Sequence, residues 1–218
     1  MTIKTLLGAA ALVISGAVSA SAVTIDLTTN DLTPIAGGLT DTQNGFTFDL
    51  IGSPTGVILG DAVPGPARGL LAAANLAGDF DGVGIGAFDD EVGGTEVLTL
   101  DFGETVLITR AFFLDLFIAV TDDSAETVAI SNGNNTLTFD AQTSTQGGFG
   151  DFVTSLYGSS FTFTFVGGND DSGIGDFALA GLEVEAVPLP AGLLLLGTAL
   201  GGLGLARRRR MSQNLIAL

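Results

Sequence analysis

A run of carboxylates around a glycine-rich segment contains the residues best suited to bind a metal ion. The six are Asp79, Asp81, Asp89, Asp90, Glu91 and Glu96. Ca²⁺ takes six to eight oxygen ligands in flexible geometry, so we expect these side chains to be candidate ligands of one structural calcium ion. Their spacing is not that of an EF-hand loop. Solvated turn residues are the alternative interpretation, and the same choice applies to Asn169–Gly173 with Asp176.

Residue types that the sequence lacks narrow the remaining chemistry. There is no Cys, no His and no Lys after Lys4, which excludes thiolate nucleophiles, Ser-His-Asp triads, His-bound zinc and Schiff-base lysines. A carboxylate pair such as Asp89 and Glu96 could hydrolyse a glycosidic bond if it faced a cleft. The glycines of 82–86 lack the strand–helix context and positive charge of a dinucleotide loop. We expect a protein that is not an enzyme.

The middle of the chain is strongly acidic, whereas both ends are apolar or basic. All 24 acidic residues lie between Asp26 and Glu185, where Arg68 and Arg110 are the only basic residues, so this stretch has a net charge of −22. Such a charge attracts cations and repels nucleic acid and anionic membranes. We therefore expect no nucleic-acid partner.

The acidic stretch also has the alternating pattern of β-strands. Phe46, Phe48 and Leu50 alternate with polar residues, and Ser160–Val166 alternates Phe with Thr. A period of two is typical of strands with one buried face, which Phe and Thr suit. Further strands are predicted at Val23–Leu27, Thr55–Leu59, Glu96–Phe102, Thr105–Phe117, Glu126–Ser131, Asn135–Phe139 and Phe177–Val184.

Turn residues separate these short runs. Asn132–Asn134 predicts a hairpin loop, and Asn44-Gly45 and Gly167–Asp170 mark other turns. The pattern predicts an all-β domain over residues 23–186, arranged as a jelly-roll-like β-sandwich. Ala67–Ala77 is the exception, and it predicts either a short helix or an apolar loop.

Residues 1–22 have the order of parts of a secretory signal peptide. Lys4 supplies the positive start, Leu6–Val18 is apolar, and Ala20-Ser21-Ala22 fits the cleavage rule for small residues. Signal peptidase would then leave Val23 as the mature N-terminus after passage through the Sec translocon. Cleavage after Ala20 is a second option, and an N-terminal anchoring helix is the alternative.

Beyond the domain, the chain has a proline motif, an apolar stretch and a basic block. The motif at 187–191 consists of Val187, Pro188, Leu189, Pro190 and Ala191. Its prolines fix φ and remove donors, which predicts an extended hinge. Residues 192–206 are uncharged, and with Leu189–Ala191 they would form a transmembrane helix of roughly 27 Å, just long enough to span a thin bilayer.

The basic block opens the tail at 207–218 and fixes the expected orientation. It consists of Arg207, Arg208, Arg209 and Arg210. Arginines at the end of a span stay cytoplasmic, so they would act as a membrane stop and leave the acidic domain outside. An ordinary C-terminal anchor is the alternative interpretation of the whole tail.

Taken in this order, the signal peptide, acidic β domain, Val-Pro-Leu-Pro-Ala motif, apolar helix and arginine cluster resemble the PEP-CTERM class of exported proteins, in its VPLPA variant. In that family exosortase, an integral-membrane cysteine protease, recognises the proline motif and removes the helix. The resemblance implies the same role for residues 187–191. Leu189 stands where the commoner pattern has Glu, and Met211–Leu218 extends past the point where such tails usually stop.

The resemblance implies a Gram-negative bacterium that makes exopolysaccharide. The protein would be held transiently in the inner membrane with its domain in the periplasm, and would then reach the cell envelope or the exterior. The leading function is a non-enzymatic surface or biofilm-matrix protein, with exopolysaccharide as a candidate partner. The alternatives are a Ca²⁺-dependent carbohydrate-binding module and a carboxylate hydrolase. The absence of Trp and the single Tyr157 disfavour a flat aromatic sugar platform.

Overall fold

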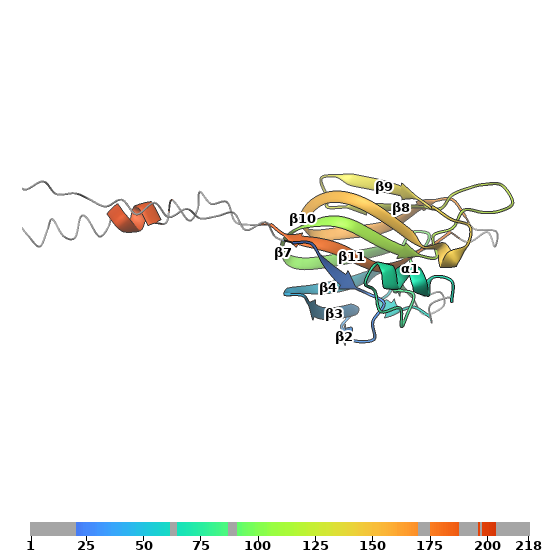
Figure 1. The fold of residues 1–218 in the computed structure, drawn as a ribbon, viewed down its shortest axis with the longest axis horizontal. Coiled ribbons are helices and arrows are strands. Elements are labelled where there is room, and N and C mark those ends of the chain that lie inside the picture. The colour runs from blue at the N-terminus through green and yellow to red at the C-terminus, as the bar shows by residue number, and fades with distance from the viewer. Residues whose placement is uncertain are drawn as a thin grey trace, which may run out of the picture. The chain divides into compact units, whose positions relative to one another are not determined.

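Antiparallel β-strands make up most of the described chain in the computed structural model (Figure 1), which confirms the all-β expectation. The structure describes residues 21–61, 65–86, 91–169, 175–187, 196 and 198–203. The strands are β1 (Val23–Asp26), β2 (Thr33–Ile35), β3 (Gly38–Gln43), β4 (Phe46–Ser53), β5 (Val57–Leu59), β6 (Val83–Ile85), β7 (Val97–Leu114), β8 (Thr127–Ser131), β9 (Thr136–Asp140), β10 (Gly150–Gly167) and β11 (Ala178–Ala186).

Two units of the chain can be distinguished. Ser21–Val187 forms the β unit, and the described residues after Val187 belong to the other unit, where 198–203 are helical. Among all described residues, no helix combines the length and apolar character needed to cross a membrane. The predicted signal peptide up to Ala20 and most of the predicted transmembrane helix lie outside the described residues.

β7 and β10 form the central strand pair of the sheet, and they pair with each other along most of their length. Beside the first half of β7 lies β4, with Leu100 opposite Leu50, and beside the second half lies β11, with Ala111 opposite Leu182. The strand order is β2-β3-β4-β7-β10-β8-β9, with β1, β6 and β5 joined through β11. The connected sheet thus branches at the central pair. We call β2, β3 and β4 the β4 wing, and β11 with β1, β5 and β6 the β11 wing.

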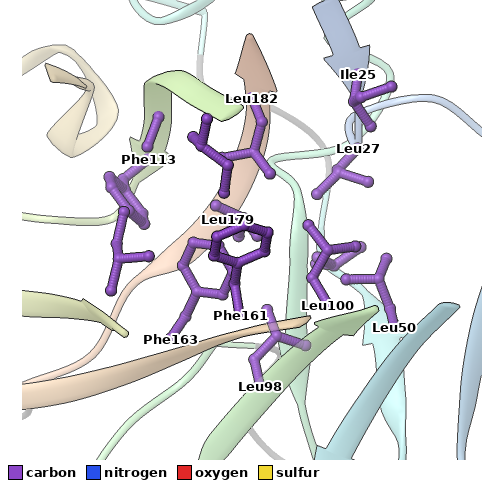
Figure 2. Close-up of a cluster of buried hydrophobic side chains, with 14 of the residues drawn as sticks. Ile25, Leu27, Leu50, Leu98, Leu100, Phe113, Phe161, Phe163, Leu179 and Leu182 are labelled. Atoms are coloured by element: carbon purple, nitrogen blue, oxygen red, sulfur yellow. The ribbon is translucent and has the colours of Figure 1, made fainter. Parts of the chain in front are cut away.

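The main core collects side chains from both wings. Phe161 and Phe163 of β10 lie beside Leu179 of β11 in its centre (Figure 2). Phe113 of β7 is fully buried, and its ring centroid lies 5.4 Å from that of Phe177 and 6.4 Å from that of Phe163. Aromatic pairs at such distances add about 0.5–1.5 kcal/mol beyond the burial of their area. Phe is therefore the main large residue that joins the wings.

A short helix, α1 (Arg68–Ala73), confirms one of the two structures expected for Ala67–Ala77. Its buried Leu71 packs with Phe112 and Leu114 of β7 and with Ala178 and Ala180 of β11. These residues form a second, smaller apolar cluster. Because β7 and β11 also face the main core, this part of the sheet is covered on both faces.

β7 and β10 are much longer than the short runs expected from sequence. Glu96–Phe102 and Thr105–Phe117 were predicted as separate strands, but β7 runs without a break from Val97 to Leu114. Gly103, with φ of +66°, places its N–H against the Asp101 carboxylate at 2.7 Å, and the register with β10 shifts there. The glycine therefore forms a bulge within one strand instead of ending it.

Candidate functional site

The structure describes four of the six predicted calcium ligands, namely Asp79, Asp81, Glu91 and Glu96. Asp79 is exposed, Asp81 is buried, and the Glu96 Oε2 atom accepts a 3.0 Å hydrogen bond from the Gly93 N–H. In the described ranges, no group of three or more acidic side chains is placed to hold a metal. Asp89 and Asp90 lie outside those ranges, so calcium binding stays a prediction.

Asp26, which is not one of the six predicted ligands, holds the segment before Asp79. Its carboxylate accepts hydrogen bonds from the Thr28 N–H at 2.8 Å, the Thr28 hydroxyl at 2.7 Å and the Ala77 N–H at 2.7 Å. The buried Thr28 hydroxyl accepts from the Gly78 N–H at 2.8 Å, and the Thr28 carbonyl accepts from the Asp79 N–H at 3.0 Å. These bonds fasten the segment to the first strand, which gives Asp26 a structural role.

A second pair of carboxylates lies where β4 meets β7. Asp49 and Asp101 are cross-strand neighbours, both exposed, and they line a hollow of about 270 Å³ together with Thr47 and Gly103. Like charges directly opposite on a sheet repel each other. This pair is therefore an electrostatic cost that the fold carries on its surface.

A cluster that sequence reasoning missed lies on β7, β10 and β11. The Arg110 guanidinium is bound in a fork by Asp151, with Nε to Oδ1 at 3.0 Å and a second contact from Nη2 to Oδ2. Its Nη1 atom lies 3.4 Å from Glu183 Oε1. The guanidinium carbon lies 5.4 Å from the centroid of the buried Phe112 ring, within the range of a cation–π contact. Arg110 is thus fixed by three strands.

A pocket of about 280 Å³ opens beside this cluster. Its lining consists of Leu70, Ala73, Ala74, Arg110, Phe149 and Asp151. The Phe149 ring stacks on that of Phe112, with centroids 6.4 Å apart and planes 18° from parallel. The pocket therefore has one wall from α1, one aromatic wall and a charged edge. The side chains of Arg110 and Asp151 remain 38% and 31% exposed, which leaves that edge open to a ligand.

The turn before β10 holds Phe149 and Asp151 in place. Gly147 and Gly148 both have positive φ, and their carbonyls accept hydrogen bonds from the N–H groups of Asp115 and Leu116, directly after β7, at 3.0 and 3.2 Å. A Cβ atom on Gly148 would lie 2.4 Å from the Leu116 nitrogen, so only glycine fits. The position of the aromatic wall thus depends on a turn that approaches β7 closely.

One signal in the sequence did point to Arg110, because it is one of two basic residues in the acidic stretch. Its partners could not be found in the same way. Asp151 and Glu183 lie 41 and 73 residues further along the chain, and only the register of three strands brings them together. Tertiary pairing of this kind leaves no local pattern.

Only the start of the predicted sorting motif lies in the described part of the chain. Val187 follows directly after β11 and is partly buried. Pro188, Leu189, Pro190 and Ala191 lie outside the described residues, as do Arg207, Arg208, Arg209 and Arg210. In comparisons with known proteins, no family model, no curated protein and no solved structure matches this chain.

Proposed function

We propose that this protein is exported and that its acidic β domain is released into the cell envelope or the surrounding matrix by cleavage at residues 187–191. The observation that carries the proposal is the order of parts after β11. A motif with two prolines, an uncharged apolar stretch and four consecutive arginines follow one another without interruption. This order suits a membrane-held tail whose basic end stays cytoplasmic.

The end of the folded unit supports this assignment. β11 ends at Ala186, and the β unit ends at Val187, the first residue of the motif. A protease that cut within the motif would therefore leave every strand whole. We assign the released domain a non-enzymatic role, with an exopolysaccharide as its partner, and we regard its two wings as the layers of a jelly-roll-like sandwich.

Intact-mass measurement of the protein recovered from the producing organism tests the proposal. We expect a mature species that begins near Val23 and ends within residues 187–191. Replacement of both motif prolines, Pro188→Ala with Pro190→Ala, should leave the tail attached, because an extended hinge is then no longer enforced. Pro34→Ala, at an exposed proline of β2, is the control and should be processed normally. If all recovered wild-type protein retains residues 192–218, the tail is an ordinary anchor and the proposal is wrong.

A further inference from the structure

The pocket beside Arg110 has an edge that offers both hydrogen-bond donors and acceptors. A guanidinium has five N–H groups, and the bonds to Asp151 and Glu183 use three of them. A carboxylate has about four acceptor positions, of which Arg110 occupies two on Asp151. The ion pair therefore keeps donors and acceptors side by side, already held in position before any ligand arrives.

Hydroxyl groups match this edge better than charged groups do. Each hydroxyl donates once and accepts twice, so two neighbouring hydroxyls can bond to a donor and an acceptor that lie together. A carboxylate or sulfate would be repelled by Asp151 and Glu183 within a domain of net charge −22. The net negative charge of this edge thus disfavours an anionic ligand, and its adjacent donors and acceptors suit a neutral ligand with adjacent hydroxyls.

The other walls of the pocket are apolar. Phe149, Leu70 and Ala73 present ring and aliphatic carbon, which packs well against the C–H face of a sugar ring. The volume of about 280 Å³ lies just below the usual range of about 300–1,000 Å³ for small-molecule sites, which suits a single ring rather than a long ligand. One aromatic wall beside a fixed hydrogen-bonding edge is a combination that recognises a ring with one apolar face and several hydroxyls.

We propose that this pocket binds one neutral pyranose ring of a polysaccharide. The choice of a polysaccharide as the source of the ring rests on the proposed matrix role, whereas the chemistry of the pocket stands on the residues above. The site differs from the calcium-dependent site expected from sequence, because it needs no ion and uses none of the six carboxylates predicted there.

Saturation-transfer NMR on the full chain in a mild detergent tests this site. The probes are the methyl glycosides of glucose, galactose and mannose, with methyl glucuronide as an anionic counterpart. We expect at least one neutral glycoside to bind with a dissociation constant in the millimolar range, because so small a ligand makes few contacts. Asp151→Asn, which weakens the Arg110 fork, and Ala73→Leu, which fills the pocket from an exposed position on α1, should each lower the affinity about tenfold or more.

Two matched controls make the test specific. Asp31→Asn removes the same charge at an exposed loop residue, and Ala72→Leu makes the same change at an exposed α1 position outside the pocket lining. Both should bind like the wild type. Ala73→Leu keeps the test decisive if Asp151→Asn does not fold, because leucine is a good helix former. The proposal is overturned if no neutral glycoside binds, if only the glucuronide binds, or if Ala73→Leu leaves the affinity unchanged. None of these results bears on tail cleavage, which the intact mass reports independently.

Discussion

Val23, the first residue of β1, lies directly opposite Val184 near the end of β11. Because the two strands are antiparallel, the start of the first strand and the end of the last strand lie at the same end of the sheet. β1 begins at the residue that the predicted signal cleavage would leave as the N-terminus, and β11 ends one residue before the proline motif. Val23 and Ala186, the strand residues nearest to the two proposed processing points, therefore lie at the same end of the sheet.

Truncation should show that the β domain is stable without the residues before Val23 and after Val187. We expect residues 23–187 to unfold at the same temperature as the β domain within the full chain. Residues 29–187 should be far less stable, because Ile25 and Leu27 are fully buried and each contributes about 1.5–3 kcal/mol. Thermal unfolding followed by circular dichroism measures both. Equal melting of the two fragments would show that β1 is dispensable.

Replacement of Asp26 should destabilise the domain. Its carboxylate accepts three hydrogen bonds, so we expect Asp26→Ala to cost about 2 kcal/mol or more in urea unfolding. Asp31→Ala removes the same charge at an exposed residue and should change the free energy of unfolding by less than about 0.5 kcal/mol. The difference between the two variants isolates the hydrogen bonds from the general relief of negative charge. A similar loss in both would argue against a structural role for the hydrogen bonds of Asp26.

Gly148 should tolerate alanine less well than Gly103 does. Both have positive φ, but only at Gly148 would a Cβ atom meet backbone, 2.4 Å from the Leu116 nitrogen, whereas at Gly103 nothing lies within 4 Å. We expect about 1 kcal/mol of backbone strain for Gly103→Ala and a clearly larger loss for Gly148→Ala. Urea unfolding compares them. Equal losses would mean that the turn before β10 can move away from β7.

Relief of the Asp49–Asp101 repulsion should stabilise the domain. Asp49→Asn keeps the shape of the side chain and removes one of two facing charges, so we expect a gain of about 0.2–1 kcal/mol at low salt. The gain should shrink as salt screens exposed charges. Asp31→Asn, the same change at an exposed loop residue, corrects for the lower net charge. Equal gains in stability for the two variants would show that repulsion between Asp49 and Asp101 does not destabilise the domain.

Calcium binding by the predicted carboxylates has a simple thermal test. An ion that binds only the folded state raises the melting temperature with its concentration. The calcium hypothesis therefore predicts a higher melting temperature in Ca²⁺ than in chelator, and a smaller difference in Asp79→Asn. Identical melting curves with and without chelator would contradict it. Mg²⁺ at the same concentration is the control for general screening of the acidic surface.

Local patterns predicted the strands that have one buried face. In β4, Phe46, Phe48 and Leu50 are buried while the residues between them are exposed, as their alternation indicated. The hairpin loop at Asn132–Asn134 also joins β8 to β9 as predicted. In these places one face of a strand and one turn decide the structure, so neighbouring residues carry all the information that is needed.

The same reasoning failed where a feature depends on a partner strand. The strand predicted at Ser160–Val166 extends back to Gly150 in β10, because β7 pairs with β10 on both sides of the register shift between Gly158 and Ser160. The Arg110 cluster is a second case, since its three charged residues come from three different strands. Such features follow from sheet register, which a pattern of neighbouring residues cannot reveal.

The pairing of β1 with β11 also determines when the fold can be completed. Within the described residues β1 pairs with no other strand, so the first strand must wait for the last one. Contacts between distant parts of a chain form slowly, because the long loop between them must first be closed. A chain that crosses a membrane from its N-terminus would therefore keep β1 unpaired until β11 had followed, and the sheet would close only after the whole domain had been translocated.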